Sequence, residues 1–305
     1  MYKFVRSILW LISLLPFPVL YAFSDFCSLI MRQFYRKKIV RENLASAFPE
    51  KTEKELRNIE VKFYHQFCDN FVEDIKMLSM SKEEMMRRIT FVGLEGVKER
   101  FDKGQTFLFL YLSHFGNWEW ISSINYSLQP WATSGQIYHH IYNKVMNELF
   151  LELRGQYGGD NIEMKETLRR ILALKKDGKN HVLGFISDQK PKWNSIHHFS
   201  PFLNHDTAVF TGTEQIARKI DAFVMYGRMS RPRRGYYQLE IIPMEDHPAT
   251  LPQNYLTDWY FRLLEEDIKQ HPEMWLWSHK RWSRTKEEWL RRQEEKKKKE
   301  EQELS

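Results

Sequence analysis

The stretch 106–119 constrains the fold of this chain more than any other. It begins with the apolar run 107–112, which lies between two glycines and is typical of a strand buried on both faces of a parallel sheet. His114 follows two residues after this run, and Glu119 comes five residues later. Functional groups in open α/β sheets gather at the carboxyl ends of the strands, so this stretch predicts an α/β fold with a candidate site at the strand end.

The spacing of His114 and Glu119 limits how their side chains can meet. Residues five apart on one regular helix point away from each other, so the two side chains meet only if the chain turns between them. Gly116 and Asn117 can supply the turn, with Asn117 as a helix N-cap. A carboxylate in the first helical turn would then hold one imidazole nitrogen and leave the other free to accept a proton. The alternative is a structural loop histidine and a carboxylate that interacts with the helix dipole.

Further strands and helices alternate along the chain. Apolar runs at 181–186, 222–226 and 235–242 predict strands, and helical patterns separate them. We therefore expect a largely parallel central sheet flanked by helices. Asp188 and Gln189 follow the strand at 181–186, where polar residues are typical of a site, although Asp188 can equally cap a turn.

The N-terminal segment 7–24 contains no charged residue. As one helix it would span roughly 27 Å, enough to cross a bilayer core or enter it as a re-entrant segment. A cleaved signal peptide and an interfacial helix kinked at Pro16 and Pro18 are the alternatives. Basic residues follow the segment, and the positive-inside rule then places the main domain on the cytoplasmic side.

Composition narrows the classes of partner. The net charge of +6 favours anionic partners, namely a membrane surface, nucleic acid or an acidic carrier protein. We find no nucleic-acid-binding motif and expect no nucleic acid partner. The two cysteines form no disulfide framework, and the histidine pairs 139–140 and 197–198 lack metal-ligand spacing. We therefore expect no metal.

Several ordered motifs resemble a known family. The His-x4-Glu motif that ends at Glu119 is similar to the His-x4-Asp/Glu box of the glycerolipid acyltransferase superfamily. More narrowly, the chain resembles the lipid A biosynthesis (late) acyltransferase family from its first apolar segment to Arg284. The other matching motifs are Asn43–Glu50, Arg154, Asp188-Gln189, Thr211-Gly212 and Pro272–Trp282. His139 and His140 stand where relatives carry an arginine, so the role of that arginine is open here.

The resemblance implies a glycerolipid acyltransferase-like fold and an O-acyltransferase without a cofactor. The donor would be acyl-acyl carrier protein, or acyl-CoA, and the acceptor a hydroxyl of a lipid A precursor. The enzyme would act at the inner (cytoplasmic) membrane. The implied catalytic residues are His114 as general base and Glu119 as its orienting carboxylate, and the implied substrate-binding residues are Asn117, Arg154, Asp188 and Gln189.

We expect three parts in the chain: an apolar membrane anchor at 1–31, an acyltransferase domain at 32–285 and a charged tail at 286–305. Two alternative functions are open. One is an acyltransferase that acts on a lysophospholipid or an amino-acid lipid, and the other is a non-catalytic membrane-anchored binding protein of the same fold.

Two surface features also have two interpretations each. The stripe that begins with Phe63, Phe67 and Phe71 is either core packing or the lining of an acyl-chain groove. The cluster of four arginines at 228–234 is either a solvated turn or a contact patch for anionic lipid or carrier protein.

Overall fold

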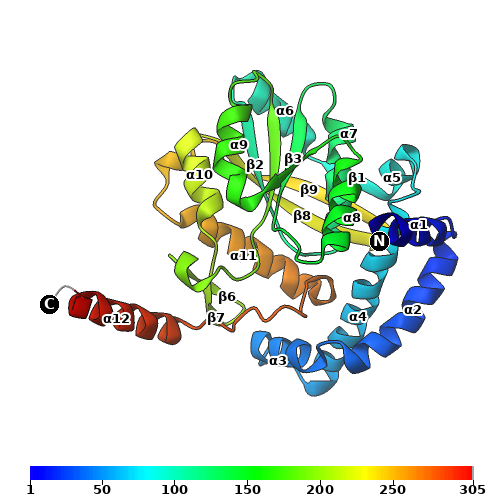
Figure 1. Ribbon diagram of the computed structural model, residues 1–305, viewed down its shortest axis with the longest axis horizontal. Coiled ribbons are helices and arrows are strands. Elements are labelled where there is room, and N and C mark those ends of the chain that lie inside the picture. Colours follow the sequence, from blue (N-terminus) through cyan, green and yellow to red (C-terminus); the bar gives the residue numbers. More distant parts are fainter. Residues whose placement is uncertain (304–305) are drawn as a thin grey trace.

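A computed structural model of the protein describes residues 1–303. Its centre is a seven-stranded sheet in the order β1-β9-β8-β2-β5-β3-β4. Strands β8 and β9 form an antiparallel hairpin, and every other neighbouring pair in this sheet is parallel. The predicted α/β fold with a largely parallel sheet is therefore confirmed (Figure 1).

The central strands match the predicted runs best. Strands β2 (Phe107–Leu112) and β5 (His181–Ile186) have the predicted bounds, whereas β8 (Phe223–Arg233) and β9 (Tyr236–Glu245) extend further. The sequence pattern did not predict the shorter strands, most of which are less apolar. These are β1 (Ile89–Val92), β3 (Thr133–Tyr138), β4 (Asp160–Glu163) and the small antiparallel pair β6 (Phe199–Phe202) and β7 (His205–Ala208).

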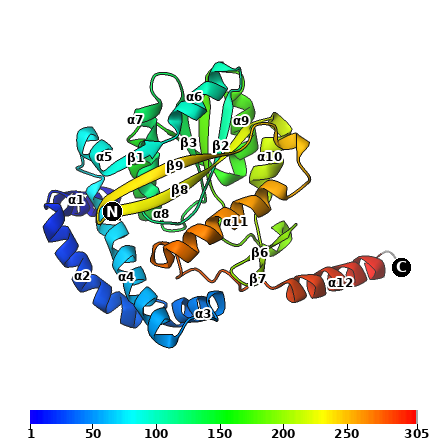
Figure 2. The same ribbon diagram turned by 180° about the vertical axis from the view of Figure 1, so that it is seen from behind.

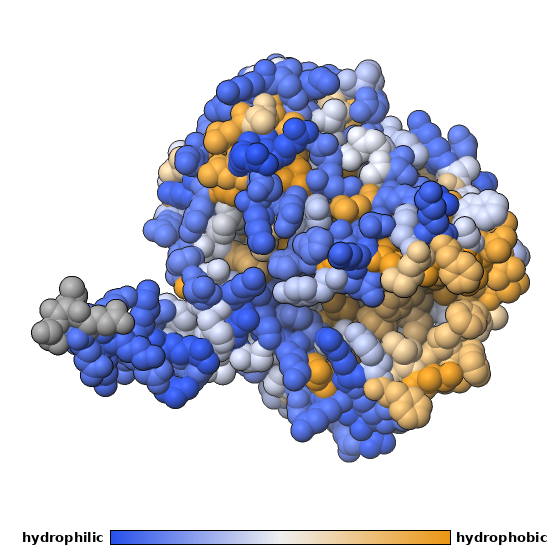
Figure 3. All heavy atoms as spheres, viewed as in Figure 1, coloured by the Kyte–Doolittle hydropathy of each residue, from blue (hydrophilic) through white to orange (hydrophobic). Residues whose placement is uncertain are grey.

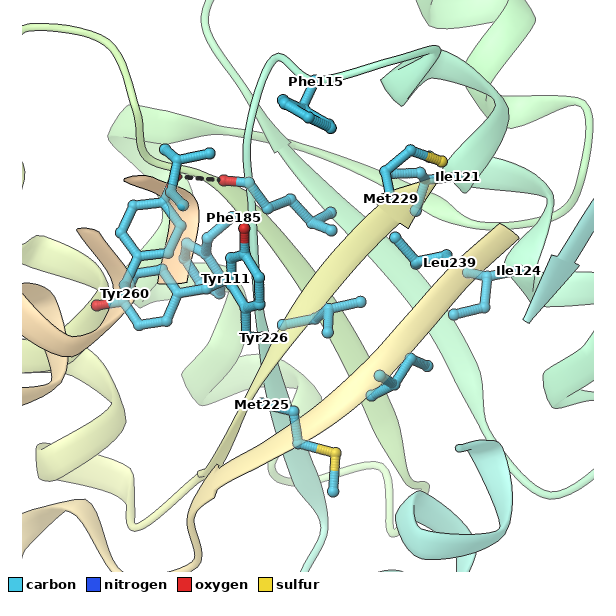
Figure 4. Packing of buried hydrophobic residues seen from close by; sticks show 14 of the residues in the cluster. Tyr111, Phe115, Ile121, Ile124, Phe185, Met225, Tyr226, Met229, Leu239 and Tyr260 are labelled. Carbon is cyan, nitrogen blue, oxygen red and sulfur yellow. Dashed lines mark hydrogen bonds between the residues drawn. The ribbon is translucent and has the colours of Figure 1, made fainter. Parts of the chain in front are cut away.

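Helices cover both faces of the sheet. Helices α8 (Lys144–Gly155) and α9 (Thr167–Leu174) lie on one face, and α11 (Tyr255–Gln270) crosses the other (Figures 1 and 2). Under α11, the ring of Tyr260 stacks on Tyr111 of β2 at 4.6 Å and meets Tyr226 of β8 at 5.9 Å (Figure 4). The smaller helices are α6 (Leu94–Asp102), α7 (Asn125–Leu128) and α10 (Gly212–Ile220).

The N-terminal segment is a bent pair of helices. A single helix over 7–24 does not form, and the break expected near Pro16 is present: the chain forms α1 (Tyr2–Ser13) and α2 (Phe17–Phe34) at an angle of 112°. The break falls at Pro16, which caps α2 in an extended conformation. Within residues 1–303, no single helix is long and apolar enough to cross a bilayer, whereas the bent pair together meets that criterion by length and composition.

The bent pair wraps around α4 (Glu53–Lys76), and α3 (Lys37–Ala47) and α5 (Lys82–Arg88) flank it. Helix α4 begins with a capping box of Thr52 and Glu55. Phe63 of its aromatic stripe lies in the core, whereas Phe71 is 47% exposed. At the other end of the chain, α12 (Lys286–Glu303) extends away from the body (Figures 1 and 2).

Helix α2 has polar residues on its inward side and apolar residues on its outward side. Phe17 and Leu20 are buried near its start, but further along Ser24 donates a hydrogen bond to Asp69 at 2.7 Å, and Tyr21 donates one to Glu73 at 2.9 Å. Its outward side is apolar, with Phe23 57% and Phe26 59% exposed. The outer faces of α1 and α2 form the orange area on the right of Figure 3.

The arginine cluster of the β8–β9 hairpin is largely neutralised inside the protein. Arg234 binds Asp25 of α2 at 2.7 Å and Asp69 of α4 at 2.6 Å. Arg231 also lies 3.8 Å from Asp69, and Arg228 binds Asp267 of α11 at 2.7 Å. These three arginines therefore hold helices against the sheet, which contradicts their interpretation as a free contact patch.

Candidate active site

The register of β2 and β5 places His114 beside Asp188. The two strands are adjacent and parallel, and Leu112 pairs with Ile186 at their carboxyl ends. His114 and Asp188 each lie two residues beyond this pair, and His114 Nδ1 is 2.7 Å from Asp188 Oδ1. His114 and Asp188 thus lie together at the carboxyl ends of the two central strands, the position at which the sequence predicts a site.

Asp188 is buried and accepts hydrogen bonds at both carboxylate oxygens. Its Oδ2 accepts from Trp275 Nε1 at 2.8 Å and from the backbone N–H of His114 at 3.2 Å. Burial alone would raise the pKa of Asp188, but the proximity of His114 and the hydrogen bonds from His114 and Trp275 hold this pKa below its usual range. Asp188 is therefore ionised at neutral pH.

The Asp188 carboxylate determines which nitrogen of His114 carries the proton. An ionised carboxylate only accepts hydrogen bonds, so Nδ1 of the neutral imidazole donates and Nε2 keeps its lone pair. The amide nitrogen of Gln189 lies 3.2 Å from Nε2 and donates to it. The His114 side chain is 20% exposed.

Glu119 was predicted to hold His114, but its carboxylate binds Arg154 instead. Its carboxylate forms a bidentate pair with Arg154 of α8, with both N–O distances at 2.6 Å. Asn117 is the predicted N-cap and accepts from Trp120 N, but the helix that follows is the 3₁₀ helix η1 (Trp118–Ile124). The Glu119 carboxylate lies against α8, so the structure replaces Glu119 by Asp188 as the partner of His114.

Arg154 and Asn117 both have internal partners. Arg154 is buried, which opposes its charge, but Glu119 and then Asp74 raise its pKa above the ordinary value. Asn117 is 1% exposed, and its amide nitrogen donates to Glu73 at 2.9 Å. The contact of Asn117 with substrate stays a prediction.

A cavity of about 240 Å³ opens beside these residues. One wall is aromatic and consists of Tyr35, Phe67, Phe71, Trp118 and Phe150. The polar part of the lining includes Glu119 and Gln189, and Gln189 connects the cavity to His114 Nε2. The aromatic stripe of α4 therefore divides, with Phe63 in the core and its next two phenylalanines at the cavity.

Sequence reasoning missed the segment that closes the site. Gly116 N donates to Met274 O at 2.9 Å, and Leu276 N donates to His114 O at 3.1 Å, so the segment clamps the loop that carries His114. Trp275 between them binds Asp188. The motif at 272–282 was a signal for this segment, but a motif alone does not identify the carboxylate that its tryptophan binds.

The remaining histidine candidates lie apart from this hydrogen-bond network. His139 and His140 follow β3 on the surface, and His139 Nδ1 lies 3.0 Å from the His140 carbonyl oxygen. Within residues 1–303, no three His, Cys, Asp or Glu side chains are grouped so that they could hold a metal ion.

Comparison with known proteins identifies the family. Residues 2–284 match the family model of the bacterial lipid A biosynthesis acyltransferases. The chain is 24% identical over 284 residues to the lipid A biosynthesis lauroyltransferase of Escherichia coli (strain K12), and the alignment covers 92% of this chain and 90% of that protein. It is also 24% identical over 285 residues to the lipid A biosynthesis palmitoleoyltransferase of the same organism, and this alignment covers 91% of this chain and 89% of that protein. The chain therefore belongs to the bacterial lipid A biosynthesis acyltransferase family.

Proposed function

We propose that this acyltransferase moves a fatty acyl group from an acyl thioester to a hydroxyl of a lipid A precursor, with His114 as general base. The donor would be acyl-acyl carrier protein or acyl-CoA. One observation supports the assignment of the base. Asp188 binds His114 Nδ1, and His114 Nε2 contacts Gln189, which lines the cavity.

The reaction needs one proton acceptor and no covalent acyl-enzyme. The acceptor hydroxyl gives its proton to His114 Nε2 while its oxygen attacks the thioester carbonyl, and ionised Asp188 stabilises the imidazolium that forms. The tetrahedral intermediate then collapses, the C–S bond breaks, and the leaving thiolate takes the proton from the imidazolium. A positioned base of this kind contributes about 10²–10⁴-fold to the rate.

The aromatic wall of the cavity suits the acyl chain. Phe67 and Phe71 lie on successive turns of α4, with ring centroids 4.9 Å apart, and Phe150 lines the same cavity. Methylene groups buried there gain about 0.8 kcal/mol each. An acyl chain bound along this wall would end near Gln189, where its carbonyl meets the hydroxyl that His114 activates.

Glu119 and Arg154 form the second part of the proposed site. Glu119 lines the cavity, and two short hydrogen bonds hold the guanidinium of Arg154 against it in one orientation. We assign to it the positioning of the polar part of a substrate, together with Asn117 in the turn before Glu119.

The bent pair α1–α2 would hold the enzyme on the inner membrane, with the catalytic domain on the cytoplasmic side. Inward serines and outward phenylalanines, such as Phe23 and Phe26, suit a helix whose outer face meets lipid rather than water. Basic residues near the end of α2 and in α3, including Arg32, Lys37 and Lys38, would meet anionic headgroups.

Vesicle flotation tests the membrane part. Charges introduced by Phe23→Glu and Phe26→Glu should remove most of the binding to vesicles of anionic phospholipid. Leu290→Glu is the matched control, because Leu290 is 49% exposed on the distant α12. Equal binding of the double variant and the control would refute the assignment of α1–α2.

Lipid analysis tests the reaction. Purified enzyme is incubated with an acyl thioester and a lipid A precursor, and mass spectrometry should find one added acyl ester per turnover. The same donor is offered with lysophospholipid and with amino-acid lipid. Acylation of either of these, with none of the lipid A precursor, would replace the proposed acceptor; no acyl transfer to any acceptor would refute the proposed activity.

A further inference from the structure

A second feature beside His114 is a group of positive charges. The basic cluster consists of Lys190, Lys280, Arg281 and Arg284, which come from two short segments after β5 and at the end of the closing motif. A hydrogen bond from Lys190 Nζ to Ser283 Oγ joins the two segments. Among residues 1–303, none of the four cations has a carboxylate oxygen within ion-pair distance.

The charges of the cluster act on one another. Burial lowers the pKa of Lys190 most, and the charges of Arg284, Lys280 and Arg281 lower it further. By contrast, Arg154 and Arg228 each bind a carboxylate, at 2.6 Å and 2.7 Å. The unbalanced charge opposes folding, so the cluster is a feature that stability alone does not explain.

Arg281 shows the imbalance most clearly. It is 1% exposed, and its Nη1 donates to Ala208 O at 2.9 Å. Its Nε and Nη2 have no hydrogen-bond partner among the described residues. Burial lowers the pKa of Arg281 although the charge of Asp188 opposes this, so the guanidinium is only partly compensated. An anion bound to the outer members of the cluster would add a second counter-charge.

The outer members are arranged to hold a ligand. Arg284 lies over the ring of Trp193, 5.6 Å from its centroid, and this contact limits the positions of the guanidinium. Lys190 is the residue after Gln189, whose amide contacts His114 Nε2. An anion bound by the cluster would therefore lie near His114, and none of the four cluster residues lines the aromatic cavity.

We propose that Lys190, Lys280 and Arg284, with Arg281 behind them, form a site for a phosphate ester carried by one of the two substrates. A phosphate ester suits the site because guanidinium and ammonium groups both form strong charge-assisted hydrogen bonds with its oxygens. The proposal rests on the proposed acyl transfer at His114 for its substrate. The phosphate can belong to the acyl donor or to the lipid acceptor, and the experiment separates the two.

Binding is tested first without any reaction. Inorganic phosphate at constant ionic strength should raise the melting temperature of the protein above its value in chloride. The variant K190Q/R284Q should lose this difference. K219Q/R262Q is the matched control, because Arg262 also lies 5.6 Å from an aromatic ring, that of Tyr255, and is not a member of the basic cluster. Equal phosphate-induced shifts in the wild type, the variant and the control would overturn the proposal.

Kinetics then identify the source of the phosphate. Donors with a phosphate, such as acyl-CoA, are compared with the acyl thioester of N-acetylcysteamine, which has none, and the acceptor is compared before and after removal of its phosphates. We expect K190Q/R284Q to raise KM about 10–100-fold for the phosphate-bearing form of one substrate and not for its phosphate-free form. A KM that changes equally for both forms of each substrate would overturn the proposal. If no acyl transfer occurs with any acceptor, the proposed function fails, and the melting experiment still decides the phosphate site.

Discussion

Asp188→Asn tests most directly how His114 is held. The carboxylate faces only donors: His114 Nδ1 at 2.7 Å, Trp275 Nε1 at 2.8 Å and the His114 backbone N–H at 3.2 Å. An amide has one acceptor oxygen and one NH₂ group, which only donates, so an asparagine cannot match this environment in either orientation.

The two orientations fail in different ways. If the amide oxygen faces Trp275, the NH₂ group faces His114 Nδ1, which must then accept, and the imidazole proton moves to Nε2. The lone pair that takes the substrate proton is then lost. If the oxygen faces Nδ1, the NH₂ group opposes the N–H of Trp275 at a cost of about 1–3 kcal/mol, which favours the first orientation. We therefore expect kcat to fall by about 10²–10⁴-fold with the fold retained.

The assay follows thiol release from the acyl thioester by purified wild type, Asp188→Asn, His114→Ala and the double variant, with thermal melts to confirm folding. The two residues act as one unit, so the double variant should be little slower than His114→Ala alone. A folded Asp188→Asn enzyme with near-normal kcat would refute this account of the base, as would a double variant whose losses add.

Three further predictions concern the surroundings of the site. Glu119→Gln weakens the bidentate pair with Arg154 but leaves the contact between His114 and Asp188. In a double-variant cycle, the loss of kcat in Glu119→Gln/Asp188→Asn should therefore equal the product of the two single losses. Phe71→Trp adds volume to the aromatic wall, so mass spectrometry of the product should find shorter acyl chains. Burial raises the pKa of Glu73 from 4.5 to about 7, so the native state keeps a proton that the unfolded chain loses between these pH values. The free energy of unfolding should therefore fall by up to ~3 kcal/mol as pH rises through that window, and urea unfolding should find a flatter pH dependence for Glu73→Gln.

The sequence was sufficient to predict that His114 and Asp188 each follow a strand, but not that these two strands are neighbours in the sheet. The apolar runs before His114 and Asp188 are long, so both residues were placed at the ends of strands. Which strands are neighbours depends on the whole sheet, and strands β3 and β4 contain too many polar residues for their pattern to predict them. Without that order, the nearest carboxylate in the chain was Glu119, whereas the partner in space is 74 residues away.

The direction of the Glu119 side chain depends on the type of helix that follows Asn117, which the sequence pattern does not specify. Asn117 as N-cap followed from residue type, but the same residues can open an α-helix or a 3₁₀ helix, and these turn by different angles per residue. The partner of Glu119 comes from α8, 35 residues further on. Local chemistry was therefore predictable, and contacts between distant segments were not.

The arrangement of α2, α3 and the closing motif connects the apolar surface to the site. Phe34 ends α2 and is 83% exposed, and the next two residues, Tyr35 and Arg36, line the cavity. Arg36 also donates to Ser278 O at 3.0 Å in the segment that carries Trp275. The helix proposed to lie in the lipid thus ends at the cavity wall and is bonded to the segment that holds Asp188. We infer that an acyl chain can pass from the membrane surface toward His114 along this wall, because the apolar outer face of α2 and the aromatic wall of the cavity meet at Phe34 and Tyr35.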